Sequence, residues 1–337
     1  MRCPNWVGDV VMATPTFDCL RQNFPDARIF GLIRNYGKGV IENGPWFDEI
    51  IGCDDKHIRG FGTLVRTIHD VRPDVAIVLP NSLRAILTVW LAGVKEIYGY
   101  RRNGRSILLS GGPTPISGKD GILPIPMVEY YMEICRWLHL EVPESIKPRL
   151  FLSDSIEERG IQLLESHGIK PADMIIGMNP GAKFGSSKCW PPEYFARLAE
   201  LLVERWNCKV LLFAGPGEEE IAQSIVKASK AMIINTGPDR VDLSFLKFLI
   251  KKCQLLVTND TGPRHYAVAF DIPVVVIMGP TDPRYTAANL EKTLVLRREL
   301  ECSPCHKKEC PHEHACMRMI KPKDVFHACE ALLEKAM

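Results

Sequence analysis

Short apolar runs alternate with segments of helical spacing along the first half of the chain. Apolar residues gather in three runs that are typical of buried strands, at residues 27–33, 48–53 and 75–79. Between and after these runs, apolar residues recur at helical intervals at 63–72 and 82–91. Parallel strands need a crossover connection, and a helix supplies it. The alternation therefore predicts a parallel sheet that is covered by helices.

The second half repeats this alternation with more elements. Its expected strands are residues 174–178, 209–214, 232–235, 255–258 and 274–278. Its expected helices are residues 155–167, 192–206, 218–229, 244–252 and 324–335. A further helix is expected at 130–138, and residues 142–149 carry two prolines and little periodicity, which is typical of a linker. We therefore predict two α/β domains, residues 1–147 and residues 148–337, each with a doubly wound sheet.

One polar turn of the second half has the composition of an anion site. Residues 258–262 follow an apolar run and precede a segment of helical character, 266–270. Asp260 or Thr261 can cap that helix, and Gly262 lets a ligand approach the backbone closely. The N–H groups and the positive dipole end of the helix then attract a phosphate. An ordinary capped turn would use the same residues, and the turn alone leaves both interpretations open.

The overall composition is that of a globular protein. Of the 337 residues, 46% are hydrophobic and 24% are charged, and the formal net charge is +2. No apolar run reaches the ~18–20 residues that a membrane span needs, and the first residues lack the apolar core of a signal peptide. We therefore expect a cytoplasmic protein. The small net charge, without a stripe of basic and aromatic residues, speaks against nucleic acid as a partner.

A set of motifs, none of them specific alone, resembles that of a known family. The motifs lie at residues 5–15, 179–182, 187–191, 215–220, 258–265 and 279–283. In order and spacing they are similar to the ADP-heptose:lipopolysaccharide heptosyltransferases of glycosyltransferase family 9, over nearly the whole chain. The start, Asn-Trp-Val-Gly-Asp, and a Cys-rich loop at 302–316 are most similar to the heptosyltransferase II members of that family.

The resemblance implies a GT-B fold, in which two doubly wound Rossmann-like domains face a cleft. The N-terminal domain would bind the acceptor, and the C-terminal domain would bind the nucleotide sugar. The implied reaction is an inverting transfer of L-glycero-D-manno-heptose from ADP-heptose to the first heptose of the lipopolysaccharide inner core. No cofactor would be required for catalysis. Because the acceptor is lipid-anchored, we expect a peripheral position on the cytoplasmic face of the inner membrane.

Two alternatives to this function stay open at this point. One is another heptosyltransferase of the same superfamily with a different acceptor. The other is a non-catalytic two-domain protein that binds a nucleotide sugar, which would bind ligand without transfer and would give Asp9 no special place.

Several residues carry the expected chemistry. The family's catalytic base falls on Asp9, and a base is needed because the acceptor hydroxyl loses a proton as it attacks the anomeric carbon. From composition alone Asp9 would be a helix cap. The expected contacts to the nucleotide sugar are Lys183, Lys188, Glu218, Asp260, Thr261, Gly262 and His265. Lys183 and His265 are added from their places beside the motifs. For Lys188, Glu218 and His265 a structural or solvated role is the alternative.

Two further clusters carry charge or thiols. Arg101, Arg102 and Arg105 form a compact basic loop, which we predict to bind the anionic groups of the acceptor. The alternative is a solvated charged loop. The second expectation is a structural zinc ion that is bound by the thiolates of Cys302, Cys305, Cys310 and Cys316. Their spacing matches standard zinc sites only in part, so free thiols in a packed loop are the alternative.

The start of the chain departs from the family pattern. The resemblance implies an apolar strand before the Asn-Trp pair, whereas only residues 1–4 precede Asn5 here. We therefore expect the first strand of the N-terminal sheet to be missing, although that strand would lie centrally in the sheet and would aim Asp9.

Overall fold

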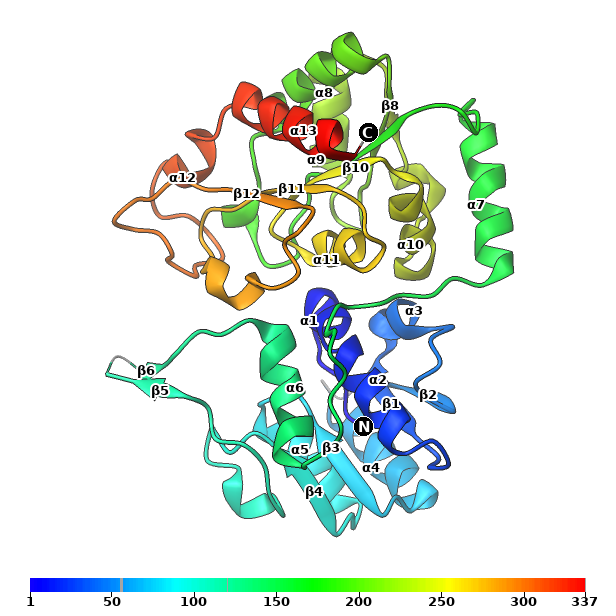
Figure 1. The fold of residues 1–337 in the computed structure, drawn as a ribbon, viewed down its shortest axis with the longest axis vertical. Helices are drawn as coiled ribbons and strands as arrows, with labels where there is room; N and C mark the ends of the chain where they lie inside the picture. The colour runs from blue at the N-terminus through cyan, green and yellow to red at the C-terminus, as the bar shows by residue number, and fades with distance from the viewer. Residues whose placement is uncertain (55–56, 120, 337) are drawn as a thin grey trace. The chain divides into compact units, whose positions relative to one another are not determined.

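Alternating strands and helices build two units, each around strands of its own (Figure 1). The computed structural model describes residues 1–54, 57–119 and 121–336. One unit comprises Met1–Phe151 with Arg284–Thr286, and the other comprises Leu152–Pro283 with Ala287–Met337. In the described part of the chain, no helix is long and apolar enough to cross a membrane.

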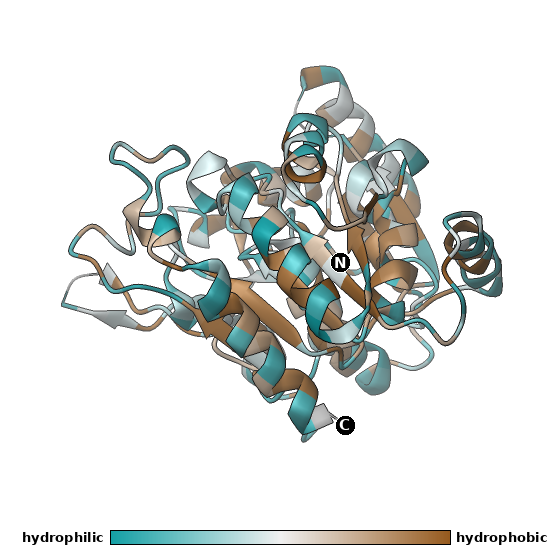
Figure 2. Cartoon of the chain, turned by 90° about the horizontal axis from the view of Figure 1, so that it is seen from above, coloured by the Kyte–Doolittle hydropathy of each residue, from teal (hydrophilic) through white to brown (hydrophobic). Residues whose placement is uncertain are grey.

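Parallel strands form the sheet of the C-terminal unit. Its order is β12-β11-β10-β7-β8-β9 among the described residues. The bounds are β7 Ile175–Asn179, β8 Lys209–Leu212, β9 Ile233–Asn235, β10 Leu255–Asn259, β11 Val274–Ile277 and β12 Thr293–Leu296. β7, β10 and β11 are buried along their whole length, because helices cover both faces of a parallel sheet. Figure 2 shows these central strands as apolar and the outer faces of several helices as hydrophilic.

The helices of this unit form two groups. α8 packs against α9 and α13, whereas α10 packs against α7 and α11. Their bounds are α7 Asp154–Ser166, α8 Pro192–Trp206, α9 Glu219–Ala228, α10 Leu243–Lys252, α11 Gly262–Ala269, α12 Ala315–Arg318 and α13 Pro322–Ala336. Short 3-10 turns of this unit lie at η3 Ser186–Lys188 and η4 Gly237–Asp239, whereas all of η5 Pro283–Thr286 except Pro283 is assigned to the other unit. The unit thus has the doubly wound pattern that the sequence predicts.

The N-terminal unit is built from shorter strands. β1 Phe30–Arg34 pairs in parallel with β2 Glu49–Cys53, and β3 Val75–Val78 pairs in parallel with β4 Glu96–Gly99. A small antiparallel pair consists of β5 Ser117–Gly118 and β6 Gly121–Ile122. The helices are α1 Val7–Met12, α2 Thr14–Asn23, α3 Lys38–Ile41, α4 Ile58–Val71, α5 Leu83–Leu91 and α6 Met127–Trp137, with 3-10 turns η1 Asn35–Gly37 and η2 Ser106–Leu108.

Residues 1–3 occupy the place between β1 and β3 where the sequence predicted a missing strand. No full strand forms there, but Arg2 makes parallel bridges to Leu32 in β1 and to Val78 in β3. The Arg2 N–H donates to the Ile77 carbonyl at 2.8 Å, which closes the gap between the two strand pairs. As predicted, no strand is assigned before α1, yet the backbone of residues 1–3 bonds to both strand pairs.

Short strands escaped the sequence analysis. β4 and β12, of four residues each, were not predicted. The first expected strand was placed three residues too early, since β1 begins only at Phe30. A four-residue strand gives only a short apolar pattern, although β3, of the same length, was predicted.

The α7–α10 contact gives a direct test of how closely the C-terminal unit is packed. A Cβ at Gly160 in α7 would lie 2.1 Å from the Phe248 ring in α10. Gly160→Ala should therefore lower the free energy of unfolding by about 1–3 kcal/mol, although alanine favours a helix. Gly62→Ala in α4 is the control, because nothing lies within 4 Å of a Cβ there. It should raise stability by about 0.5–1 kcal/mol in urea unfolding. Equal effects of both changes would contradict the close packing.

Candidate active site

Polar loops follow three neighbouring strands at one edge of the C-terminal sheet. β10, β7 and β8 are adjacent in the sheet, and the chain order reverses between β7 and β10. Ligands of doubly wound sheets bind beyond the carboxyl ends of the strands at such a point. The turns near residues 180, 216 and 260 lie at this edge because they follow these strands.

Two buried asparagines brace these loops against one another. Asn179, the last residue of β7, donates to the Thr261 hydroxyl at 3.1 Å. Asn259, the last residue of β10, donates to the Pro180 carbonyl at 2.6 Å and accepts from the Trp190 N–H at 3.1 Å. Neither asparagine was predicted to connect these loops. The sequence does offer a signal for this role, because an asparagine stands at the last position of each of two buried strands. A buried side-chain amide must form hydrogen bonds, and at a strand end its partners come from the neighbouring loops.

Asp260 is the centre of a buried charge cluster at the same edge. Its carboxylate accepts from Lys188 Nζ at 2.9 Å, from Arg264 at 2.8 Å and from the Thr281 hydroxyl at 2.6 Å. Lys188 Nζ also donates to the Asp260 backbone carbonyl at 2.8 Å. Arg264 and Thr281 were not among the predicted site residues. They meet Asp260 only because α11 and the loop after β11 fold onto the end of β10.

The charges in this cluster determine its ionisation. Burial by itself works to raise the pKa of Asp260, but the charges of Arg264 and Lys188 outweigh burial and hold that pKa below its ordinary value. The carboxylate is therefore ionised. Two cations facing one carboxylate leave a net positive charge in a poorly solvated place, and such a charge attracts an anionic ligand strongly.

The start of α11 differs in detail from the prediction that Asp260 or Thr261 caps it. Thr261 occupies the N-cap position, but no side chain makes a capping bond there. The Thr261 hydroxyl instead accepts from Asn179, and the Asp260 carboxylate is engaged with Lys188 and Arg264. Pro263 has no N–H and the Arg264 N–H donates to the Thr261 carbonyl at 3.3 Å, so this terminus offers an anion the Gly262 N–H and the helix dipole. The start of α11 at Gly262 therefore retains the features of an anion site.

Glu218 connects two of the loops through a carboxylate that fits against glycines. Its Oε2 accepts from the Gly215 N–H at 2.8 Å. A Cβ on Gly181 would lie 1.9 Å from Glu218 Oε1, so only a glycine leaves room for the carboxylate. Burial raises the pKa of Glu218, while the Gly215 N–H and the charge of Lys183 act in the opposite direction. Lys183 itself is exposed on the loop that follows β7.

His265 lies in the first turn of α11 and is almost completely buried. Burial, assisted by the positive charge of Arg264, lowers its pKa to about 3. The imidazole is therefore neutral near neutral pH, and it brings no positive charge to a phosphate.

In the N-terminal unit, Asp9 is held by a buried tyrosine. Asp9 lies in the first turn of α1, and the Tyr131 hydroxyl from α6 donates to its Oδ1 at 2.8 Å. Burial raises the pKa of Tyr131 well above its ordinary value, and the charge of Asp9 adds to this. Tyr131 therefore remains a donor, and a hydrogen bond to a carboxylate favours its ionised form. No sequence pattern pointed to Tyr131, which reaches Asp9 across 122 positions of the chain.

The three arginines of the predicted basic loop have different environments. Arg101 is exposed and Arg102 is half-buried, with a donor 3.5 Å from the Tyr130 hydroxyl. Arg105 is fully buried and donates to the carbonyls of Tyr100 and Pro80, and burial lowers its pKa to about 10. Arg105 was predicted to bind the acceptor together with Arg101 and Arg102, whereas its buried guanidinium supports the backbone beneath that loop.

The four cysteines of the predicted zinc loop come together. Cys302, Cys305, Cys310 and Cys316 line one pocket of about 200 Å³ in the C-terminal unit. Within the part of the chain that the structure describes, no three His, Cys, Asp or Glu side chains already stand as a metal-binding group. The zinc ion stays a prediction.

The burial of His265 predicts a dependence of stability on pH. The folded protein holds His265 at a pKa of about 3, below the value of 6.5 for an exposed histidine, so unfolding takes up a proton below pH 6.5. Stability should fall as the pH decreases, by about 2 kcal/mol from this group between pH 6.5 and pH 5. His265→Gln should flatten the decrease in urea unfolding, and the exposed His57→Gln is the matched control. An unchanged decrease in the His265 variant would contradict its buried, neutral state.

Comparison with known proteins identifies the family of the chain. Residues 61–316 match the model of glycosyltransferase family 9 (heptosyltransferase). The chain is 28% identical over 346 residues to lipopolysaccharide heptosyltransferase 2 of Escherichia coli (strain K12), which covers 98% of this chain and 97% of that protein. It is 28% identical over 314 residues to lipooligosaccharide heptosyltransferase 2 of Haemophilus influenzae, covering 87% and 86%.

A solved structure agrees with the fold. The structure of ADP-heptose lps heptosyltransferase II from E. coli superposes with a TM-score of 0.80 at 26% identity, covering 99% of this chain and 98% of that one. This likeness confirms the predicted α/β class with Rossmann-like units of the GT-B type. Because the family match extends over well more than half of the chain, the protein belongs to glycosyltransferase family 9, the heptosyltransferase family, and is a glycosyltransferase.

Proposed function

We propose that the protein transfers L-glycero-D-manno-heptose from ADP-heptose to the first heptose of the lipopolysaccharide inner core, with inversion at the anomeric carbon. Relatives named heptosyltransferase 2 match nearly the whole chain, which supports this acceptor. The observation that carries the proposal is the buried cluster of Lys188, Arg264 and Asp260 beside the start of α11. Its net positive charge suits a diphosphate leaving group.

The donor contacts follow from the strand-end loops. Thr261 and Gly262 offer the backbone N–H groups of α11 to a phosphate, and Lys188 offers a charge. Glu218 accepts hydrogen bonds from ribose hydroxyls, as acidic residues do in dinucleotide-binding folds. His265, which is neutral, contributes packing and at most a neutral hydrogen bond.

Asp260 acts mainly through its neighbours. Its carboxylate holds Lys188 and Arg264 in place, because two unpaired cations could not stay buried together without the donor. When the diphosphate binds, Lys188 can share its donors between Asp260 and a phosphate oxygen. Lys183, exposed on the same loop as Lys188, supplies a second cation.

Asp9 is the catalytic base of the proposed reaction. The acceptor hydroxyl gives its proton to the Asp9 carboxylate as its oxygen bonds to the anomeric carbon of the heptose. At the same time the bond from that carbon to the phosphate oxygen breaks, and ADP leaves with the electron pair. Tyr131 fixes the orientation of the carboxylate through its 2.8 Å hydrogen bond.

The basic loop of the N-terminal unit is the proposed acceptor site. Arg101 and Arg102 bind anionic groups of the inner core, and Arg105 supports their loop from beneath. Since the acceptor is lipid-anchored, the protein works as a peripheral protein at the cytoplasmic face of the inner membrane. The transfer itself uses no cofactor. The zinc ion of the Cys-rich loop has a structural role and no catalytic one.

Incubation with ADP-heptose and a truncated inner-core acceptor that ends in one heptose tests the function, with mass spectrometry as the readout. The expected product is the acceptor with one added heptose. Asp9→Ala should keep ADP affinity but lower turnover by about 100-fold or more, whereas Tyr131→Phe should lose much less. Addition only to a different acceptor would redirect the proposal within the family. Binding of ADP-heptose without transfer would refute it.

Lys188→Ala tests the donor site separately from catalysis. Without this cation the cluster loses its net positive charge, and the dissociation constant for ADP should rise by more than about tenfold. Calorimetry with ADP measures this constant, and the exposed Lys170→Ala in the same unit is the control. An unchanged ADP affinity in the Lys188 variant would remove Lys188 from the donor site.

A further inference from the structure

The loop between β12 and α12 has no helix or strand of its own, yet with the start of α12 it brings four cysteines together: Cys302, Cys305 and Cys310 lie in the loop, and Cys316 lies in α12. Their spacing is Cys-X2-Cys-X4-Cys-X5-Cys from Cys302 to Cys316. Cys302 is exposed, Cys305 and Cys310 are half-buried, and Cys316 is buried. All four are free thiols. A loop with mostly exposed side chains has little apolar burial to keep it in one conformation.

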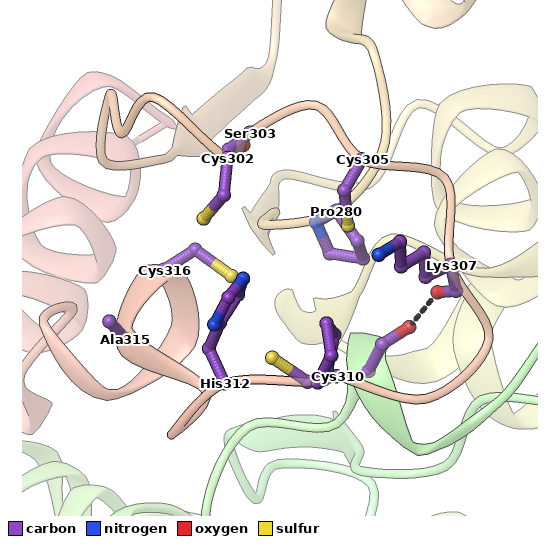
Figure 3. A pocket seen from close by; sticks show the side chains of 11 residues that line it. Pro280, Cys302, Ser303, Cys305, Lys307, Cys310, His312, Ala315 and Cys316 are labelled. Carbon is purple, nitrogen blue, oxygen red and sulfur yellow. Dashed lines mark hydrogen bonds between the residues drawn. The ribbon is translucent and has the colours of Figure 1, made fainter.

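The four thiols face one space. They line the same pocket of about 200 Å³, together with His312 and Lys307. Figure 3 shows the four sulfur atoms pointing into this pocket from different sides rather than in two pairs. Four sulfurs around one centre are the arrangement of a thiolate metal site.

The same loop is fastened to both loops that carry the donor cluster. On one side, the Ser187 N–H donates to the Lys308 carbonyl at 3.0 Å, and its hydroxyl donates to the Lys307 carbonyl at 2.5 Å. Ser187 directly precedes Lys188. A Cβ on Gly185 would lie 2.3 Å from the Lys308 carbonyl, so the two loops are in close backbone contact.

On the other side, the loop holds the segment that leads to Thr281. The Ser303 hydroxyl donates to the Gly279 carbonyl at 2.6 Å, and the Cys305 N–H donates to the Pro280 carbonyl at 3.0 Å. A Cβ on Gly279 would lie 2.7 Å from the Cys316 sulfur. The thiol pocket is therefore built against the backbone that places Lys188 and Thr281 around Asp260.

We propose that Cys302, Cys305, Cys310 and Cys316 bind a thiophilic divalent cation of the zinc class, and that this ion fixes the loop that braces the donor site. Each thiol gives its proton to solvent as its sulfur binds the ion, and the four sulfurs move inward from the pocket walls. Four thiolates around one divalent ion carry a net negative charge, which Lys307 at the pocket and the neighbouring Lys308 offset. The inference that the ion braces the donor site rests on the proposed role of Lys188 in binding the donor.

Zinc content tests the site independently of any activity. The full chain, purified from zinc-supplied cells and dialysed, should hold about one zinc ion per molecule by elemental analysis, released by a thiol-specific mercurial. The double variant Cys302→Ser with Cys305→Ser should lose the ion, and circular dichroism verifies that it is folded. Cys208→Ala, in the same unit but outside the loop, should retain it. A wild type without zinc after dialysis against Zn²⁺, or equal losses in both variants, would overturn the site.

ADP affinity tests the bracing. Wild type stripped of zinc by a chelator should bind ADP about tenfold more weakly than the loaded protein, and added Zn²⁺ should restore the affinity. In Lys188→Ala the two forms should bind alike, because the braced cation is gone. Equal ADP affinity of the loaded and stripped wild type would overturn the bracing. If neither form binds ADP, the proposed donor site and the bracing of that site are both refuted. The zinc content still decides whether the four cysteines bind a metal ion.

Discussion

Asp260 carries its negative charge inside the protein, and this arrangement is stable only because two cations and a hydroxyl meet it. Removing a charge from water is costly, and the cost is recovered only through close, well-placed partners. The partners come from three separate segments: Lys188 from the loop after β7, Arg264 from α11 and Thr281 from the loop after β11. The need to compensate one buried carboxylate therefore holds together the whole edge of the sheet where the donor is proposed to bind.

The surrounding structure keeps this edge rigid before any ligand arrives. Asn179 and Asn259 tie the ends of β7 and β10 to neighbouring loops, and the carboxylate of Glu218 fits where Gly181 has no side chain. Donors and charges that are already in place need no reorganisation when charge develops on a leaving group. The Cys-rich loop lies behind the same segments and is bonded to both, so its order bears on the site although it contributes no group to the proposed donor contacts.

Much of this molecule could be predicted from local patterns. The long buried strands and amphipathic helices of the C-terminal unit were recognisable, because each has enough residues to show a period. The turn at residues 258–262, which was predicted as an anion site, was recognisable as a strand-to-helix turn for the same local reason. Prediction was wrong where a side chain's partner is distant in sequence. The cap expected of Asp260 or Thr261 is absent, and Arg105 is buried beneath the loop in which it was predicted to bind the acceptor, because neither Lys188 nor the carbonyl of Pro80 is visible from their neighbours in the chain.

The sequence by itself determined the α/β alternation, the edge at which the polar turns follow the strands, and the motifs that are similar to those of the heptosyltransferases. Only the tertiary structure decided which charges compensate Asp260, that Tyr131 holds Asp9, and that Arg2 bridges β1 and β3. The reason is physical. Local propensity acts between near neighbours in the chain, whereas ion pairing, burial and hydrogen bonding act between neighbours in space, and folding alone brings those together.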